Sequence, residues 1–199
     1  PLMKPGEKED LVLFSFIAGL KAMTGGELTA KNLETKFTAY SKSSAFFIES
    51  VGSMLRRTSD GEPEQSLFIE LSIPAQTALV ATAVEAWKLP PELKDKNQRD
   101  IPWTKENVTD EVLAQSKKLP LERITNADSP PMEAIFAFRV PLQPGGMVFV
   151  KVPKDTAGPG GFITAEDFLD VTMLPKIPKE ATLMGNGGLM ALNGERKIN

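Results

Sequence analysis

None of the 199 residues is a cysteine or a histidine. No disulfide and no zinc site of the Cys/His type can therefore hold the fold together, and its stability must come from a buried apolar core. Apolar residues make up 41% of the chain and charged residues 25%, as in globular proteins. The same absence excludes Ser-His-Asp and Cys-His catalytic sites, cysteine-ligated iron–sulfur clusters and His- or Cys-ligated haem.

Charge and patterning exclude further classes. The formal net charge is −3, so a sequence-independent grip on nucleic acid over the whole surface is not expected. There is no apolar run of 18 residues, so no membrane-spanning helix is predicted. The acidic clusters lack the loop pattern of a hard-cation site. We therefore predict no catalytic residue, no cofactor and no metal site, and the sequence assigns no compartment.

The N-terminal half has helical spacing. Residues 5–23 begin with a proline and acidic residues and end before Gly25-Gly26, which is typical of a helix. In residues 30–57, apolar side chains such as Leu33, Phe37 and Tyr40 recur at helical intervals. The short connection between the two segments predicts an antiparallel helical hairpin. A third helix is expected over residues 74–89, after a short strand at 67–73.

The C-terminal half has strand-like segments at 134–140 and 147–152. Turn residues lie between them, so we expect a β-hairpin. Residues 107–118 and 164–172 are expected to be helical, and residues 175–199 form a tail rich in proline and glycine. The predicted fold class is α-rich α+β. One compact domain would span residues 1–174, with 90–131 as a surface excursion, and the extended tail would follow at 175–199.

Two glycine-rich segments, residues 158–161 and 185–188, lack the patterns of a Walker loop or a dinucleotide-binding fingerprint. Use in turns is the favoured interpretation. No motif is close enough to that of a known family to indicate a relative.

The tail carries apolar side chains that a purely disordered segment would lack. Extended segments with such anchors often lie along a protein partner. The leading hypothesis is a non-catalytic structural or accessory subunit of a larger protein assembly, in self-association or in a hetero-complex, with extended terminal arms as contacts. The predicted partner-binding residues are Met173, Leu174, Ile177, Leu183, Met184, Leu189, Met190 and Leu192.

Three alternatives stay open. The first is a carrier of an apolar ligand, lipid or pigment, with a pocket among Phe14, Phe16, Phe37, Phe46, Phe47 and Trp87. The second is an enzyme that depends on carboxylates or lysines. The third is a coat-like subunit that packages nucleic acid. Its anion contacts would be Arg56, Arg57, Lys94, Lys96, Arg99, Lys117 and Lys118. Acidic residues interleave with these cations, so nucleic acid is the less favoured partner.

Overall fold

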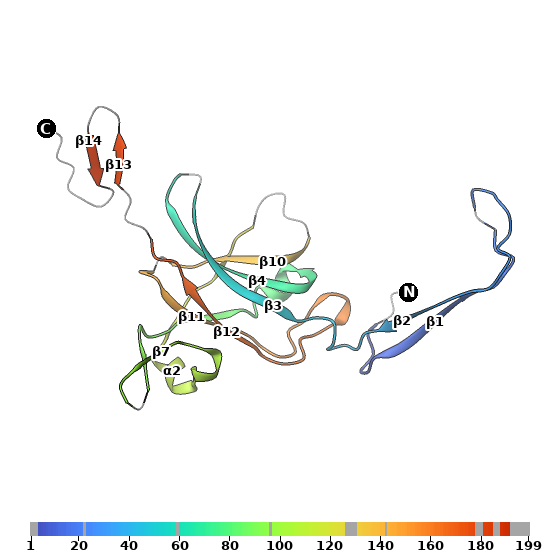
Figure 1. Ribbon diagram of the computed structural model, residues 1–199, viewed down its shortest axis with the longest axis horizontal. Coiled ribbons are helices and arrows are strands. Elements are labelled where there is room, and N and C mark those ends of the chain that lie inside the picture. The colour runs from blue at the N-terminus through green and yellow to red at the C-terminus, as the bar shows by residue number, and fades with distance from the viewer. Residues whose placement is uncertain are drawn as a thin grey trace.

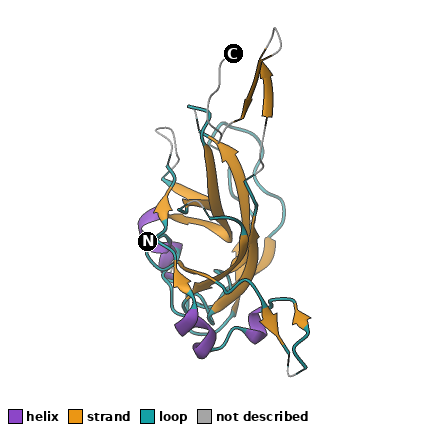
Figure 2. Cartoon of the chain, turned by 90° about the vertical axis from the view of Figure 1, so that its left-hand side faces the viewer, coloured by secondary structure: helices purple, strands orange, loops and turns teal. Residues whose placement is uncertain are grey.

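The chain folds as a β-protein, and the expected α-rich α+β class is wrong. The computed structural model describes residues 4–21, 23–58, 60–95, 97–125, 131–141 and 143–177, with the backbone of 181–184 and 188–191. Strands account for 46% of the described residues and helical segments for 9%. Figure 2 shows that strands form most of the body and that the helical turns lie at its periphery.

The elements follow one another as fourteen strands and four helical segments within the described residues. The strands are β1 (Asp10–Phe16), β2 (Leu33–Ala39), β3 (Ile48–Arg57), β4 (Pro63–Gln76), β5 (Glu85–Lys88), β6 (Leu93–Lys94), β7 (Asp100–Ile101), β8 (Lys117–Lys118), β9 (Glu122–Arg123), β10 (Met132–Arg139), β11 (Gly146–Val152), β12 (Phe168–Leu174), β13 (Ala181–Met184) and β14 (Gly188–Ala191). The helical segments are α1 (Thr77–Val80), η1 (Lys105–Asn107), α2 (Asp110–Gln115) and η2 (Pro159–Gly161).

Two four-stranded antiparallel sheets form the body (Figure 1). The first has the strand order β3-β4-β10-β9 and the second β12-β11-β5-β8. The edge strands β3 and β12 lie beside each other, and Ser53 Oγ donates a 2.5 Å hydrogen bond to the carbonyl oxygen of Met173 across this seam. The body is therefore a β-sandwich whose two sheets meet along β3 and β12.

The core lies between the sheets. Its side chains follow the two-residue period of strands, because alternate positions point to the same face. Within β4 these are Leu67, Ile69 and Leu71, beside core side chains of β10 in the same sheet, and the facing side chains come mainly from β11 of the second sheet. The largest fully buried side chains include Phe46, Phe136, Phe138, Val148, Val150 and Val152. Burial of this set removes enough apolar surface from water to hold the sandwich without disulfides.

A second apolar cluster covers the outer face of the second sheet. Phe149 points away from the main core and packs with Trp103 and Leu89, both almost fully buried. The indole Nε1 of Trp103 donates a 3.2 Å hydrogen bond to the carbonyl of Pro90. Residues 90–119, expected as part of a surface excursion, thus contribute buried side chains of their own.

The N-terminal helical hairpin is absent, and β1 and β2 form an antiparallel β-hairpin in its place. A short apolar run such as residues 11–16 fits a strand as well as a buried helix. Gly25 and Gly26 lie in the loop between β1 and β2, where their φ angles of +93° and +118° suit glycine. Beyond β2 the predicted helix 30–57 is replaced by a linker over residues 40–47 and by β3.

The other expected helices and the hairpin also need correction. In residues 74–89 only α1 is helical, and β5 follows it. Residues 164–172 enter strand β12, and helix α2 covers only six residues of 107–118. The segments 134–140 and 147–152 are strands, as expected. They do not pair with each other, because β10 lies in the first sheet and β11 in the second. The tail contains the antiparallel pair β13–β14.

The two α-helices of the described residues are four and six residues long. Neither approaches the roughly 20 residues that a helix needs to cross a bilayer.

Candidate functional site

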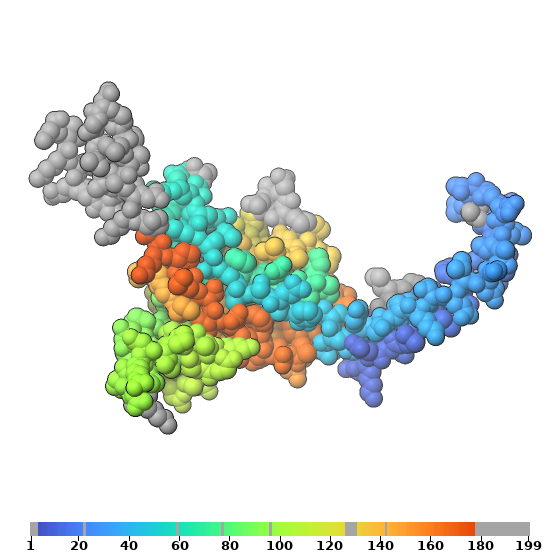
Figure 3. Space-filling model, in the orientation of Figure 1, coloured from blue at the N-terminus to red at the C-terminus, as the bar shows by residue number. Residues whose placement is uncertain are grey.

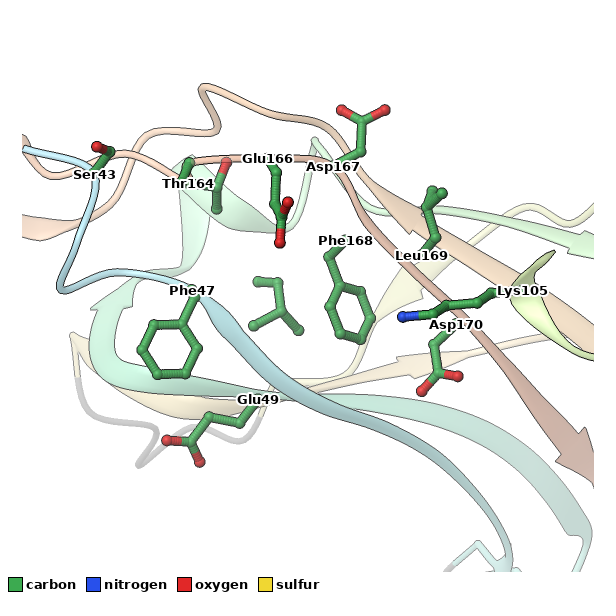
Figure 4. Close-up of a pocket in the computed structure, with 12 residues that line it drawn as sticks. Ser43, Phe47, Glu49, Lys105, Thr164, Glu166, Asp167, Phe168, Leu169 and Asp170 are labelled. Atoms are coloured by element: carbon green, nitrogen blue, oxygen red, sulfur yellow. The ribbon is translucent and has the colours of Figure 1, made fainter.

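A cavity of about 520 Å³ opens beside the seam between β3 and β12. The first residues of β3, the segment that leads into β12, and Lys105 form its walls (Figure 4). The lining residues are Ser43, Phe47, Ile48, Glu49, Lys105, Thr164, Ala165, Glu166, Asp167, Phe168, Leu169 and Asp170.

The walls of this cavity are acidic and aromatic. Glu49, Glu166 and Asp170 contribute carboxylates and Lys105 an ammonium group, while Phe47 is half-exposed. Among the described residues no group of acidic side chains is placed to hold a metal ion. The arrangement offers a surface for a cationic or apolar group.

Two other lining residues serve the local fold. Asp167 points away from the cavity (Figure 4), accepts a 2.7 Å hydrogen bond from the backbone N–H of Lys154, and pairs with Lys151 at 3.1 Å. The hydrogen bond from Lys154, followed by the contact with Lys151, lowers the pKa of Asp167 below its usual value. Thr164 Oγ1 donates to the carbonyl of Pro153 and accepts from the N–H of Thr156, both at 3.0 Å. These groups are already engaged within the protein.

The second candidate is the β1–β2 hairpin with its loop, residues 10–39, which we call the arm. It extends away from the sandwich (Figures 1 and 3). Backbone hydrogen bonds fix its base, from Lys42 N–H to the Gly6 carbonyl at 2.7 Å and from Ile163 N–H to the Lys42 carbonyl at 2.9 Å. Phe46, which follows this base, is fully buried in the core. The arm is therefore anchored at one end and free of the body along its length.

The pairing of the arm sorts its side chains onto two faces, because directly opposed residues of antiparallel strands share a face. Val12 opposes Phe37, and Phe16 opposes Leu33. With Phe14, these five side chains form the apolar face of the arm, where the rings of Phe14 and Phe37 stack 5.1 Å apart. The polar face carries Leu11, Leu13, Ser15, Glu34, Lys36 and Thr38.

This apolar face is open to water. Phe14, Phe16, Leu33 and Phe37 are between 42% and 62% exposed. Apolar side chains continue into the loop, where Ile17, Met23 and Leu28 are also exposed. A contiguous apolar surface that is exposed to water commonly marks an interaction site. An isolated two-stranded hairpin is also only marginally stable in water, so the arm gains most from a partner that covers it.

The predicted tail residues fall into three groups. Met173 and Leu174 belong to β12, where Met173 is exposed and Leu174 is buried in the core; Ile177, just beyond, is partly exposed. Leu183, Met184, Leu189 and Met190 lie on β13 and β14, of which only the backbone is described. Leu192 lies outside the described residues. The contacts of the distal tail thus remain a prediction.

The predicted cationic residues are spread over the edges of the two main sheets and the β6–β7 hairpin. Arg56 and Arg57 are on β3, the edge of the first sheet, where Arg56 pairs with Glu64 and Arg57 donates to the Gly61 carbonyl. Lys117 and Lys118 are on β8, the edge of the second sheet farthest from β12. Lys118 pairs with Glu85, and Lys94 contacts Glu92 and Asp100. Arg99 is exposed, and Lys96 lies outside the described residues.

The six aromatic residues of the carrier hypothesis occupy separate environments. Phe14, Phe16 and Phe37 lie on the arm, and Phe46 fills the main core. Phe47 lines the cavity, and Trp87 packs in the second cluster. The structure does not bring them together around one pocket.

Sequence reasoning missed the arm, although the sequence contains a signal for it. From residue 33 to 39, Leu, Thr, Phe and Ala alternate with Glu, Lys and Thr. This period of two indicates a half-exposed strand. The helical spacing of the longer segment 30–57 obscured it.

The chain is similar to segments of two large bacterial proteins. It is 24% identical to the alpha-2-macroglobulin of Rickettsia conorii over 213 aligned positions, which cover 96% of this chain. It is also 24% identical to an alpha-2-macroglobulin homolog of Yersinia pestis over 204 positions and its full length. The aligned segments are 11% and 10% of those proteins, so the chain spans about a tenth of the length of the relatives it matches. No family model and no solved structure matches it.

Proposed function

We propose that the chain is a non-catalytic β-sandwich module of a larger assembly related to alpha-2-macroglobulin, in which it makes protein–protein contacts. One observation carries the proposal: the similarity runs through nearly the whole chain yet involves only a tenth of each relative. A segment that corresponds to one small part of a long protein is expected to pack against other parts of it.

The arm supports a contact function. It holds an exposed apolar face away from the sandwich, where the side chains stabilise nothing else in the described structure. Protein interfaces are enriched in aromatic side chains at their centres, and this face carries three phenylalanines. The contact element is thus the N-terminal arm, with the C-terminal tail as a second candidate.

A non-catalytic role agrees with the residue types. The whole sequence lacks histidine and cysteine, which serve most proton transfer near neutral pH and thiolate chemistry. Both relatives are alpha-2-macroglobulins by name. On that basis we propose, for the larger assembly, an activity related to protease inhibition. Loss of protease activity on a protein substrate after incubation with the purified assembly would test that part.

The main proposal is tested on the protein as the cell makes it. An antibody raised against the sandwich would detect the protein after native and after denaturing electrophoresis. A native mass far above the 21.7 kDa of this chain is expected. If the mass stays high after denaturation, the module belongs to a longer polypeptide; if it falls to that of the chain, the module is a separate subunit. A native monomer of 21.7 kDa would refute the proposal.

A further inference from the structure

We infer that the apolar face of the arm docks onto an uncharged apolar surface of another domain in the larger assembly, with the polar face turned to solvent. This inference deepens the proposed function and rests on it. Three properties of the arm lead to this partner: its charge pattern, its size and its position.

The charge pattern defines the chemistry of the partner surface. Asp10, at the base of β1, lies on the same face as Val12. From Val12 to Phe16 and from Leu33 to Phe37, the charged side chains are Glu34 and Lys36, and both lie on the polar face. A charged group on the partner would lose water against the phenylalanines and gain no counter-charge. The partner surface must therefore be apolar and uncharged where it meets this face.

The same pattern favours a protein over a lipid surface. Residues 10–39 contain three lysines, Lys21, Lys31 and Lys36, and three acidic residues, Asp10, Glu27 and Glu34. The formal charge of the arm is thus 3 − 3 = 0, whereas segments that bind anionic membrane surfaces are rich in lysine and arginine. The apolar face carries five apolar side chains, whereas on the opposite face Leu11 and Leu13 stand among polar and charged groups, so the larger apolar surface lies on one side of the arm.

The size of the face argues against a free-standing dimer. The seven paired positions of the hairpin extend over ~24 Å, and two strands are ~10 Å wide, so the face covers on the order of 250 Å². Stable complexes bury about 800 Å² on each partner. A face this small binds well only when its partner is held nearby, which raises the effective concentration. In the two relatives about nine-tenths of the polypeptide lies outside the aligned segment and can supply such a surface.

Hydrogen exchange of the arm tests the docking. Amides of β1 and β2 are expected to exchange at least tenfold more slowly in the native assembly than in the isolated 199-residue chain, because docking covers the strands. Equal exchange rates in an assembly of high native mass would overturn the inference and leave the proposed function intact. A native mass of 21.7 kDa would instead remove the proposed function itself.

A pair of neighbouring substitutions tests which face docks. Phe14 and Leu13 are 46% and 50% exposed and lie on opposite faces of β1. Phe14→Glu places a charge against the uncharged partner and should abolish the added protection. Leu13→Glu places the same charge on the solvent side and should retain it. Equal effects of the two variants would overturn the assignment of the apolar face.

Two measurements on the isolated chain test whether a second copy of the chain or a lipid surface binds the apolar face instead. Sedimentation velocity over a 100-fold concentration range should show a monomer, and flotation with phosphatidylcholine and phosphatidylglycerol vesicles should leave the chain in the dense fraction. A dimer that Phe14→Glu dissociates would identify a second copy as the occupant. Flotation that Phe14→Glu prevents would identify a lipid surface. Either result would overturn docking onto another domain.

Discussion

Gly158 lies against the ring of Phe46, so close that a Cβ atom on Gly158 would come within 2.5 Å of Phe46 Cδ1. The backbone at Gly158 has a φ of −110°, which any residue can adopt, so the position needs glycine for space and not for conformation. Phe46 is fully buried where the base of the arm joins the sandwich. This contact therefore fixes the region from which the arm projects.

Gly158→Ala should destabilise the protein by roughly 1–3 kcal/mol, since a buried ring has little room to move. Urea denaturation would measure the change in the free energy of unfolding. Ala157→Ser, at the exposed neighbouring position, should change it by less than about 0.5 kcal/mol. In a Phe46→Leu background the cost of Gly158→Ala should fall. An unchanged cost there would contradict the steric explanation.

Gly158 also illustrates what the sequence could predict. Residues 158–161 lack a phosphate-binding pattern, and their composition predicts a turn. In the structure Gly158 directly precedes the 3-10 turn η2. The strands at 67–73, 134–140 and 147–152 were also predictable, because alternation or apolar runs bounded by turn residues are local signals. The pairing of β10 with β4 and of β11 with β5 was not predictable, since strands that pair across more than about 50 residues leave no local pattern. β10 pairs with β4, although the turn residues before β11 suggested a hairpin.

The wrong prediction of an N-terminal helical hairpin has a different origin. A glycine within a helix costs stability, and Gly52 lay inside the predicted helix 30–57. In the structure Gly52 opposes Phe68 on β4, and a Cβ there would lie 2.2 Å from Phe68 Cζ. Glycine in a strand often marks such a close approach. The apolar face of the arm was missed for the same reason. Alternate residues share one face only in a strand, so predicting helices over β1 and β2 concealed that face.

Glu64 should make the free energy of unfolding depend on pH in the acidic range. Its buried carboxylate contacts both Arg56 and Arg139. Burial alone would raise the pKa of Glu64, but hydrogen bonds from Arg139 and Arg56, and their charges, lower it below 4.5. Because the folded-state pKa is lowered, the stabilisation is complete above pH 4.5 and is lost as the pH falls through the folded-state pKa.

Glu64→Gln should reduce stability by about 1–3 kcal/mol at pH 7, because it removes charge-assisted hydrogen bonds. The difference from the wild type should shrink as the pH falls below 4.5. Urea denaturation at several pH values would measure it. Glu62→Gln, at an exposed position two residues away, serves as the control and should leave the pH profile unchanged. A wild-type advantage that persists undiminished at low pH would argue against the assignment.

Trp103 should hold residues 90–119 against the second sheet. It is 8% exposed and packs with Leu89 and Phe149. Trp103→Ala should cost roughly 3–5 kcal/mol locally, because it leaves a cavity under this segment. Hydrogen exchange should increase in residues 90–119 while β4 and β10 stay protected. Trp103→Phe keeps most of the packing and should cost about 1 kcal/mol. A uniform rise in exchange across both sheets would show that the segment does not open separately.

Gln65 joins the two sheets at one end of the sandwich. Its Nε2 donates to the carbonyls of Gln143 and Pro175 at 3.0 and 2.7 Å, and its Oε1 accepts from the N–H of Gln143 at 2.7 Å. The side chain is fully buried. These bonds tie β4 to the connection before β11 and to the end of β12.

Gln65→Leu keeps the approximate volume but leaves these backbone groups without the side chain that bonds them. Each unsatisfied buried group costs about 1–3 kcal/mol, so the free energy of unfolding should fall by several kcal/mol. Thermal unfolding followed by circular dichroism would measure the loss. Gln143→Leu removes only a side chain that bonds the nearby Pro141 carbonyl, and its effect should be within about 1 kcal/mol. Equal losses in the two variants would contradict a bridging role for Gln65, because the bridge uses the backbone of Gln143 and not its side chain.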